Sequence, residues 1–151
     1  MPQVERKHRA VRWTEEMIAI QSVNPHYGEG AAGEKELSHY IESLCKEEGV
    51  HVYRQRVLPD RDNLIIEVRT GRPDKTLLFE AHMDTVSLGN MLNPLTPTVR
   101  DGRLHGRGAC DTKSSLAAML HAVLESAKRA DEMACDLVMV AAVDEEHESA
   151  V

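Results

Sequence analysis

The sequence is poor in aromatic residues and has no long apolar run. Trp, Tyr and Phe together make up 3% of the 151 residues, so surfaces that stack nucleic-acid bases are not expected. The formal net charge of −7 disfavours nucleic acid and anionic membranes as partners. No segment approaches the length of a transmembrane helix, and residues 1–12 lack the apolar core of a signal peptide. We therefore expect no nucleic-acid and no membrane partner.

Cysteine is also scarce. Cys45, Cys110 and Cys135 are odd in number, widely spaced and outside any Cys-x-x-Cys pattern. This pattern is typical of reduced thiols and predicts a cytoplasmic protein. Cys110 on its own is expected to be a small buried hydrophobe. A chain of this length can bury a core and ordinarily forms one domain.

The spacing of apolar residues predicts two helices in the first third of the chain. The first ends before Pro25 and the second stops at Gly49. Their apolar faces consist of Trp13, Met17 and Ile20, and of Leu37, Tyr40, Ile41 and Leu44. Strands are expected over residues 50–57 and 63–69, with a turn at residues 61–63.

The remaining elements alternate between strand and helix. An apolar strand ends at His82, an amphipathic helix follows Asp111, and a last apolar strand covers residues 137–143. The stripe of the helix consists of Leu116, Met119, Leu120, Val123, Leu124 and Ala127. Residues 90–97 form an irregular loop that could shape the rim of a pocket. This order of elements predicts an α/β fold with a mixed β-sheet flanked by helices.

His82 and Asp84 stand together at the end of an apolar strand. Side chains at positions i and i+2 of a strand point the same way, and open α/β sheets bind ligands at strand ends. His82 could bind a metal while Asp84 holds its other ring nitrogen. The alternative for an isolated His-x-Asp is a pair of polar residues that meet solvent.

Asp111 follows a turn-rich stretch and stands where the amphipathic helix is expected to begin. Taken alone it would be a helix N-cap, because Asp is among the best capping residues. Gly106 and Gly108 suggest a nucleotide-binding loop, but the third glycine of that pattern falls at Asp111. Lys113 is expected to be a residue of the first helical turn, and His105 a wall residue.

Asp144, Glu145 and Glu146 follow the last strand directly. Three adjacent carboxylates repel each other unless solvent or a cation relieves them. A solvated acidic turn is the usual explanation of such a triplet. Here the strand resembles the one that ends at His82, so these groups could meet at one edge of the sheet.

In this order, the three segments resemble the amino-terminal part of the M20 metallopeptidase and deacylase family. That family includes acetylornithine deacetylase, succinyl-diaminopimelate desuccinylase, aminoacylase and the carboxypeptidase G type. The matching stretches are residues 79–86, 106–113 and 143–146. The resemblance implies that residues 1–151 form part of a zinc-exopeptidase-like catalytic domain.

The resemblance also implies roles for individual residues. His82 would be a ligand of one metal, Asp111 would bridge two metals, and Glu146 would be a ligand of the other. Asp84 would orient His82, and Glu145 would be the general base. The implied cofactor is two Zn²⁺ ions in a complete site, with Co²⁺ as a possible substitute. The implied reaction is hydrolysis of an amide bond in an N-acyl amino acid or a small peptide.

The chain departs from the family in what it does not contain. The family pattern puts a further acidic ligand, a histidine ligand and an inserted lid and dimerisation domain beyond Val151, so a homodimer is expected only for a full-length form. Residues 147–150 replace the glycine-rich turn that usually follows the Glu pair in the family, and His147, as the direct neighbour of Glu146, is expected to be a solvated loop residue. Two interpretations remain: an incomplete two-metal amidohydrolase, or an inactive fragment that serves at most as a non-catalytic interaction module.

Overall fold

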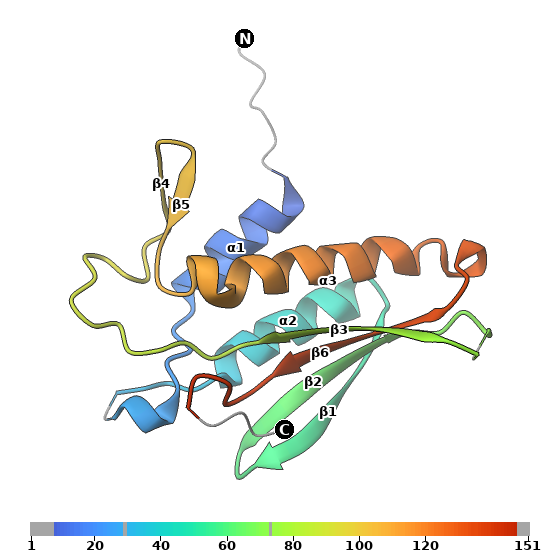
Figure 1. Cartoon of the computed structure of the whole chain (residues 1–151), viewed down its shortest axis with the longest axis horizontal. Coiled ribbons are helices and arrows are strands. Elements are labelled where there is room, and N and C mark those ends of the chain that lie inside the picture. Colours follow the sequence, from blue (N-terminus) through green and yellow to red (C-terminus); the bar gives the residue numbers. More distant parts are fainter. Residues whose placement is uncertain (1–7, 29, 73, 148–151) are drawn as a thin grey trace.

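The computed structural model describes residues 8–28, 30–72 and 74–147, which form an α/β fold (Figure 1). Its helices are α1 (Arg9–Ala19), α2 (Lys35–Glu47) and α3 (Ser114–Ala127), with short turns η1 (Pro25–Tyr27), η2 (Ala109–Lys113) and η3 (Ala130–Glu132). Its strands are β1 (His51–Leu58), β2 (Arg61–Val68), β3 (Thr76–His82), β4 (Thr98–Arg100), β5 (Arg103–His105) and β6 (Asp136–Ala142). None of the helices in this part of the chain has the length and apolar character needed to span a bilayer.

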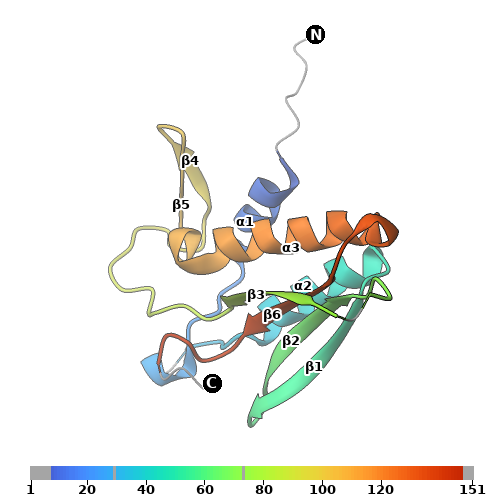
Figure 2. The same cartoon turned by 45° about the vertical axis from the view of Figure 1, so that its right-hand side comes forward.

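The main sheet has the strand order β1-β2-β6-β3. β2 is antiparallel to both of its neighbours, whereas β3 runs parallel to β6. In this parallel pair Thr76 lies opposite Asp136 and His82 lies opposite Ala142. Helices α2 and α3 lie against the sheet, and α1 packs on α3 (Figures 1 and 2). The predicted mixed sheet with flanking helices is therefore confirmed.

The apolar faces predicted from the sequence form the core between the helices and the sheet. Fully buried side chains include Trp13, Met17, Leu37, Ile41, Leu64, Ile66, Leu116, Leu120 and Leu124. Burying one large aliphatic or aromatic side chain contributes roughly 1.5–3 kcal/mol. The core thus fixes α3 and the strand pair β3–β6 against one another, and these elements lead to the candidate site.

The predicted turn at residues 61–63 is wrong by two residues. The chain reverses at Pro59 and Asp60, because β1 and β2 pair up to Leu58 opposite Arg61. Proline suits the first corner of a tight turn, and Asp60 adopts a left-handed conformation with φ of 58°. Residues 61–63 are therefore the first residues of β2.

The region between β3 and α3 holds two short strands that were not predicted. β4 and β5 form a small antiparallel hairpin whose turn is Asp101-Gly102, both with positive φ. An Asp-Gly pair is a strong hairpin signal, but only a few residues flank it on either side. Residues 90–97 form an irregular loop, as predicted.

Helix α3 begins three residues later than expected. Asp111 has an extended backbone with φ of −117° and ψ of 97°, and it lies three residues before Ser114, the first residue of α3. The N-cap position of α3 is Lys113 instead. The interpretation of Asp111 as an N-cap is therefore wrong, and its carboxylate is available for other contacts.

Candidate metal centre

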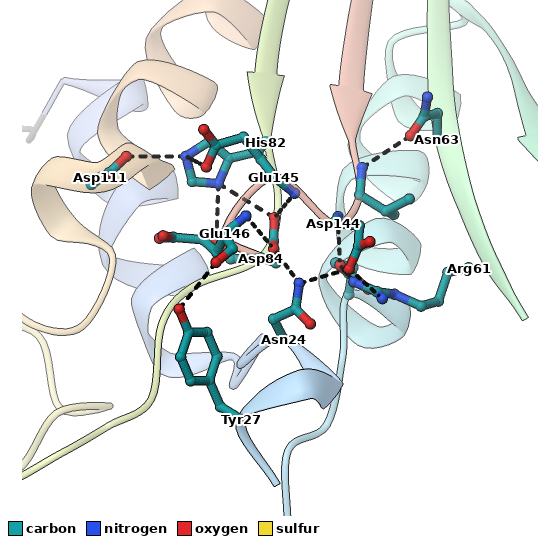
Figure 3. A network of polar contacts seen from close by, with 12 residues as sticks. Asn24, Tyr27, Arg61, Asn63, His82, Asp84, Asp111, Asp144, Glu145 and Glu146 are labelled. Carbon is teal, nitrogen blue, oxygen red and sulfur yellow. Dashed lines mark hydrogen bonds and ion pairs between the residues drawn. The ribbon is translucent and has the colours of Figure 1, made fainter. Parts of the chain in front are cut away.

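Three segments bring polar side chains to the carboxyl end of the parallel pair β3–β6 (Figure 3). His82 is the last residue of β3, and Asp84 follows two residues later. The turn after β6 carries Asp144, Glu145 and Glu146, while Asp111 approaches from η2. Segments far apart in sequence thus meet because the two strands end at the same edge.

The turn that carries Asp111 passes very close to the end of β3. Gly108 has a φ of +78°, and a Cβ atom there would lie 2.9 Å from the Thr85 side chain. Glycine is therefore needed both for the backbone conformation and for the close approach. This packing holds Asp111 opposite His82.

His82 is at the centre of the polar cluster. Its Nε2 atom lies 3.0 Å from Oδ1 of Asp111 and 3.6 Å from Oε2 of Glu145. The imidazole is nearly buried, whereas the side chains of Asp111 and Glu145 are 74% and 50% exposed. The site is therefore closed on the side of the sheet and open on the side of the two carboxylates.

One imidazole and two carboxylates are close enough to share an ion. His82, Glu145 and Glu146 each offer a ligand atom, and these atoms all lie within 4.8 Å of one another. Asp111 contacts His82 but is not part of this closest group. A base that acts on a metal-bound water must lie near the ligands, and both Glu145 and Glu146 meet this condition.

Asp84 connects His82 to the acidic turn. Its carboxylate is buried, lies 3.4 Å from Nδ1 of His82, and accepts hydrogen bonds from the amides of Glu145 (3.2 Å) and Glu146 (3.0 Å). The backbone carbonyl of Asp84 also lies 3.1 Å from His82 Nδ1. Burial would raise the pKa of Asp84, but hydrogen bonds from His82, Asn24 and the Glu146 amide outweigh burial and lower it. Asp84 therefore orients the ring and holds the turn.

Asp144 does not join the cluster, although it is the first residue of the acidic triplet. Its φ of 69° turns the backbone, and its carboxylate accepts hydrogen bonds from Asn24 (2.9 Å) and Arg61 (2.7 Å). Arg61 also pairs with the buried Glu34, whose Oε1 accepts a hydrogen bond from the Asp144 amide. Asn24, Glu34 and Arg61 were not found from the sequence, because they lie at least 60 residues from the site residues they contact.

The electrostatics of the cluster favour a cation. Burial of His82 lowers the pKa of its imidazole, but hydrogen bonds to Asp84 and Asp111 and the charge of Glu145 outweigh burial and raise it to about 9. Burial and the nearby charge of Asp111 raise the pKa of Glu146. Imidazole nitrogen and carboxylate oxygen are ligands that zinc accepts. The donor set and the surplus of negative charge therefore fit a divalent metal ion.

His147, Lys113 and Cys110 lie close to the proposed ligands Glu146 and Asp111 in the sequence. His147 is exposed, as predicted, and stacks on His26 with ring centroids 3.5 Å apart. Lys113 is buried, and its Nζ donates to the carbonyls of Met17 (2.9 Å) and Ile20 (2.8 Å) at the end of α1.

Cys110 is exposed beside Asp111, so its predicted burial is wrong. The η2 turn directs Cys110 away from the core that begins at Lys113.

A cavity of about 270 Å³ opens beside the cluster and is lined by Asp111, Glu146, Cys110 and Met91 among others. A second cavity of about 260 Å³ shares Met91 with it and is lined by the 91–96 loop and by His105. The predicted contribution of this loop to a pocket rim and of His105 to a pocket wall is thus confirmed. Together the two cavities leave room for a small molecule next to the carboxylates.

Comparison with known proteins finds a matching peptidase family and similar metallohydrolases. The sequence model of peptidase family M20/M25/M40 matches residues 78–150. A succinyl-diaminopimelate desuccinylase of Methylobacillus flagellatus is 36% identical over 119 residues, which are 76% of this chain and 29% of that protein. An uncharacterised metallohydrolase of Methanocaldococcus jannaschii is 30% identical over 126 residues, which are 74% of this chain and 30% of that protein. The chain thus spans about a third or less of the length of these relatives.

Solved structures show the same fold. Human carnosine dipeptidase 1 superimposes with a TM-score of 0.72 at 22% identity, over 93% of this chain and 32% of that one. An M20 family metallo-carboxypeptidase from Sulfolobus solfataricus gives a TM-score of 0.73 at 19% identity, over 89% and 30%. A Bacillus subtilis protein described as a dinuclear metal binding peptidase gives 0.66 at 16%, over 91% and 35%.

Proposed function

We propose that this chain forms the amino-terminal part of a catalytic domain of peptidase family M20/M25/M40, whose sequence model matches residues 78–150, and that the domain hydrolyses amide bonds with two metal ions. The convergence of His82, Asp111, Glu145 and Glu146 over the buried Asp84 is the observation that carries this proposal. The names of the matching proteins, a desuccinylase and a dipeptidase, support an N-acyl amino acid or a small peptide as substrate.

The proposed ligands divide between two zinc sites. His82 would hold one ion, Glu146 would hold the other, and Asp111 would be a ligand of both. Catalytic zinc normally keeps three protein ligands, and the described residues supply fewer than two ions need. We therefore assign the remaining ligands, a lid domain and a dimer contact to segments outside residues 1–151. Cobalt is expected to replace zinc, and the three unpaired cysteines support a cytoplasmic location.

The residues of the chain have separate tasks in the proposed reaction. When bound, the metal ions would polarise the amide carbonyl and lower the pKa of water. Asp84 holds Nδ1 of His82, so that Nε2 faces the cleft. Glu145 accepts a proton at a carboxylate oxygen as water attacks the carbonyl carbon, and then delivers it to the leaving nitrogen. The products are a carboxylic acid and an amine.

The test compares the 151-residue chain with the longer product of its gene, where the reading frame continues. Both are assayed against N-acyl amino acids and dipeptides with added zinc or cobalt. The longer product should hydrolyse at least one of these substrates, and the 151-residue chain should not. A longer product that binds metal and hydrolyses no amide would favour the non-catalytic interaction module. Turnover by the 151-residue chain itself would contradict the assignment of ligands outside it.

Two substitutions in the longer product separate the base from the ligands. Glu145→Gln should lower turnover by about 10²–10⁴-fold and leave the metal content intact, because it removes only a proton acceptor. His82→Ala should lose metal. Elemental analysis of both variants measures this difference. Equal loss of metal in both would show that Glu145 is a ligand.

A further inference from the structure

Asn24 is a buried residue that connects the two segments on which the candidate ligands stand. It is 0% exposed, and its Nδ2 donates one hydrogen bond to Oδ2 of Asp84 (2.7 Å) and one to Oδ1 of Asp144 (2.9 Å). Asp84 follows β3, and Asp144 begins the turn that carries Glu145 and Glu146. Figure 3 shows the Asn24 side chain below both carboxylates.

The backbone of Asn24 is itself fixed to the end of β3. Its amide donates to the carbonyl of Thr85 (2.9 Å), and the Thr85 amide donates to the carbonyl of Ser22 (3.0 Å). Val23 pairs with Thr85 as a parallel bridge. The Oδ1 atom of Asn24 accepts a hydrogen bond from the His26 amide (3.0 Å). All polar atoms of the side chain therefore have partners, and the residue has little freedom to move.

We propose that Asn24 is a positioning residue that sets the spacing between His82 and the turn of Glu145 and Glu146. Its action is indirect, because it contacts neither His82 nor either glutamate through its side chain in the described structure. The proposal that this spacing serves metal binding rests on the proposed function. The proposal that Asn24 holds the turn does not.

The chemistry of an amide suits this place. Asp84 and Asp144 are both buried carboxylates that approach the same Nδ2 atom, and like charges so close destabilise each other. A primary amide has two N–H donors and no charge, so it can satisfy one oxygen of each. A carboxylate at position 24 would add a third negative charge, and an alanine would remove one of the two donors of each oxygen, leaving the Glu146 amide on Asp84 and Arg61 on Asp144.

The experiment uses Asn24→Ala and Asn24→Asp, with Asn63→Ala as a matched control. Asn63 is also an asparagine beside this turn, since its Oδ1 accepts the Val143 amide at 2.9 Å, but within the described residues its side chain makes no hydrogen bond to Asp84 or Asp144. Two quantities are measured on the folded 151-residue chain. They are the hydrogen-exchange rates of the Glu145 and Glu146 amides by NMR, and the zinc affinity by calorimetry.

Both Asn24 variants should accelerate exchange of the Glu145 and Glu146 amides, on the order of 10-fold, because these amides donate to Asp84. Zinc affinity should fall about 10- to 100-fold, the usual effect of losing a group that supports metal ligands. Asn63→Ala should change neither by more than about threefold. Unchanged exchange in both Asn24 variants, or an equal change in Asn63→Ala, would overturn the proposal.

Two outcomes separate this proposal from the proposed function. If the wild-type chain binds no zinc but the exchange rates respond as expected, the metal site fails and the positioning role stands. If the Asn24 variants do not fold, hydrogen exchange of the Asn24 side chain in the wild-type protein tests the proposal instead. Both Nδ2 protons of Asn24 should then exchange much more slowly than those of the exposed Asn90, and equal rates would overturn the proposal.

Discussion

The two ends of the strand pair β3–β6 carry acidic residues in opposite situations. At the amino end, Asp136 lies opposite Thr76, and its carboxylate accepts hydrogen bonds from the amide (2.7 Å) and the hydroxyl (2.8 Å) of Thr70. Arg69 lies 3.3 Å from its second oxygen. At the carboxyl end, the oxygens of Asp111 and Glu145 face His82 and solvent.

The two ends differ in whether the protein itself supplies hydrogen-bond donors to the carboxylates. The amide and hydroxyl of Thr70 hold the pKa of Asp136 below its ordinary value, so this carboxylate is stable as an anion within the fold. At the other end, burial and the charge of Asp111 raise the pKa of Glu146. A strand-end carboxylate is therefore structural where the protein supplies its donors and is available for a ligand where it does not.

The largest expected loss of stability comes from removing the charge of Arg61, which pairs with two carboxylates near the carboxyl end of β3–β6. Arg61→Met would leave Glu34 and Asp144 as buried carboxylates without their ion pair. Breaking a buried pair in this way costs about 3 kcal/mol of unfolding free energy. Urea denaturation measures this loss, and Arg56→Met is the control, because Arg56 is 66% exposed and its pair with Asp62 contributes less than about 1 kcal/mol. Equal losses in the two variants would contradict the buried network.

The next largest loss of stability is expected in η2, the segment that carries Asp111. Lys113→Met keeps the apolar stem but removes both hydrogen bonds to the carbonyls of Met17 and Ile20. The expected loss is about 2 kcal/mol, since two buried acceptors lose a donor. Lys128→Met serves as control, because the Lys128 side chain is 47% exposed. A loss below about 0.5 kcal/mol would show that Lys113 does not hold the Asp111 turn to α1.

A smaller effect, which disappears in acid, is expected at the amino end of the strand pair. The folded pKa of Asp136 lies below its ordinary value of 3.8, so its contribution to stability is present above pH 3.8 and is lost as the pH falls through the folded pKa. Asp136→Asn cannot titrate there. The difference in unfolding free energy between wild type and variant should therefore shrink as the pH drops below about 3.8. A difference that grows in acid would refute this.

The smallest intervention labels thiols without changing any residue. Cys110 neighbours Asp111 and is exposed, Cys135 neighbours Asp136 and is half-buried, and Cys45 is buried. Burial raises the pKa of Cys45 to about 12, which suppresses its thiolate. Alkylation followed by mass spectrometry should modify Cys110 first, Cys135 next and Cys45 only on unfolding. Early labelling of Cys45 would show that the core opens more easily than its packing indicates.

The parts of the molecule that local pattern determines were predictable. The faces of α1, α2 and α3 follow from apolar residues three and four apart, and β6 from a continuous apolar run. His82 and Asp84 were found because two polar residues end such a run. Convergence of His82 and Asp84 with Glu145 and Glu146 at one sheet edge also follows from a parallel strand pair, whereas Asp111 reaches this edge from η2.

The supports of the site could not be predicted. Asn24 contacts Asp84 and Asp144 across 60 and 120 residues, and Arg61 reaches Asp144 across 83. No periodicity connects positions so far apart, and each residue alone resembles an ordinary turn or surface residue. The start of α3 was misplaced for a related reason, because Lys113 satisfies the end of α1 rather than a local cap.

The central claim is that the carboxyl end of β3–β6 holds a metal ion and the amino end does not. Adding Co²⁺ to the isotope-labelled chain and recording paramagnetic broadening of the backbone amides tests both ends at once. We expect broadening centred on residues 82–85, 110–112 and 145–147, none at Thr70 and Asp136, and its loss in His82→Ala. Broadening centred on Asp136, or spread evenly over exposed acidic residues such as Asp131 and Glu132, would contradict the claim.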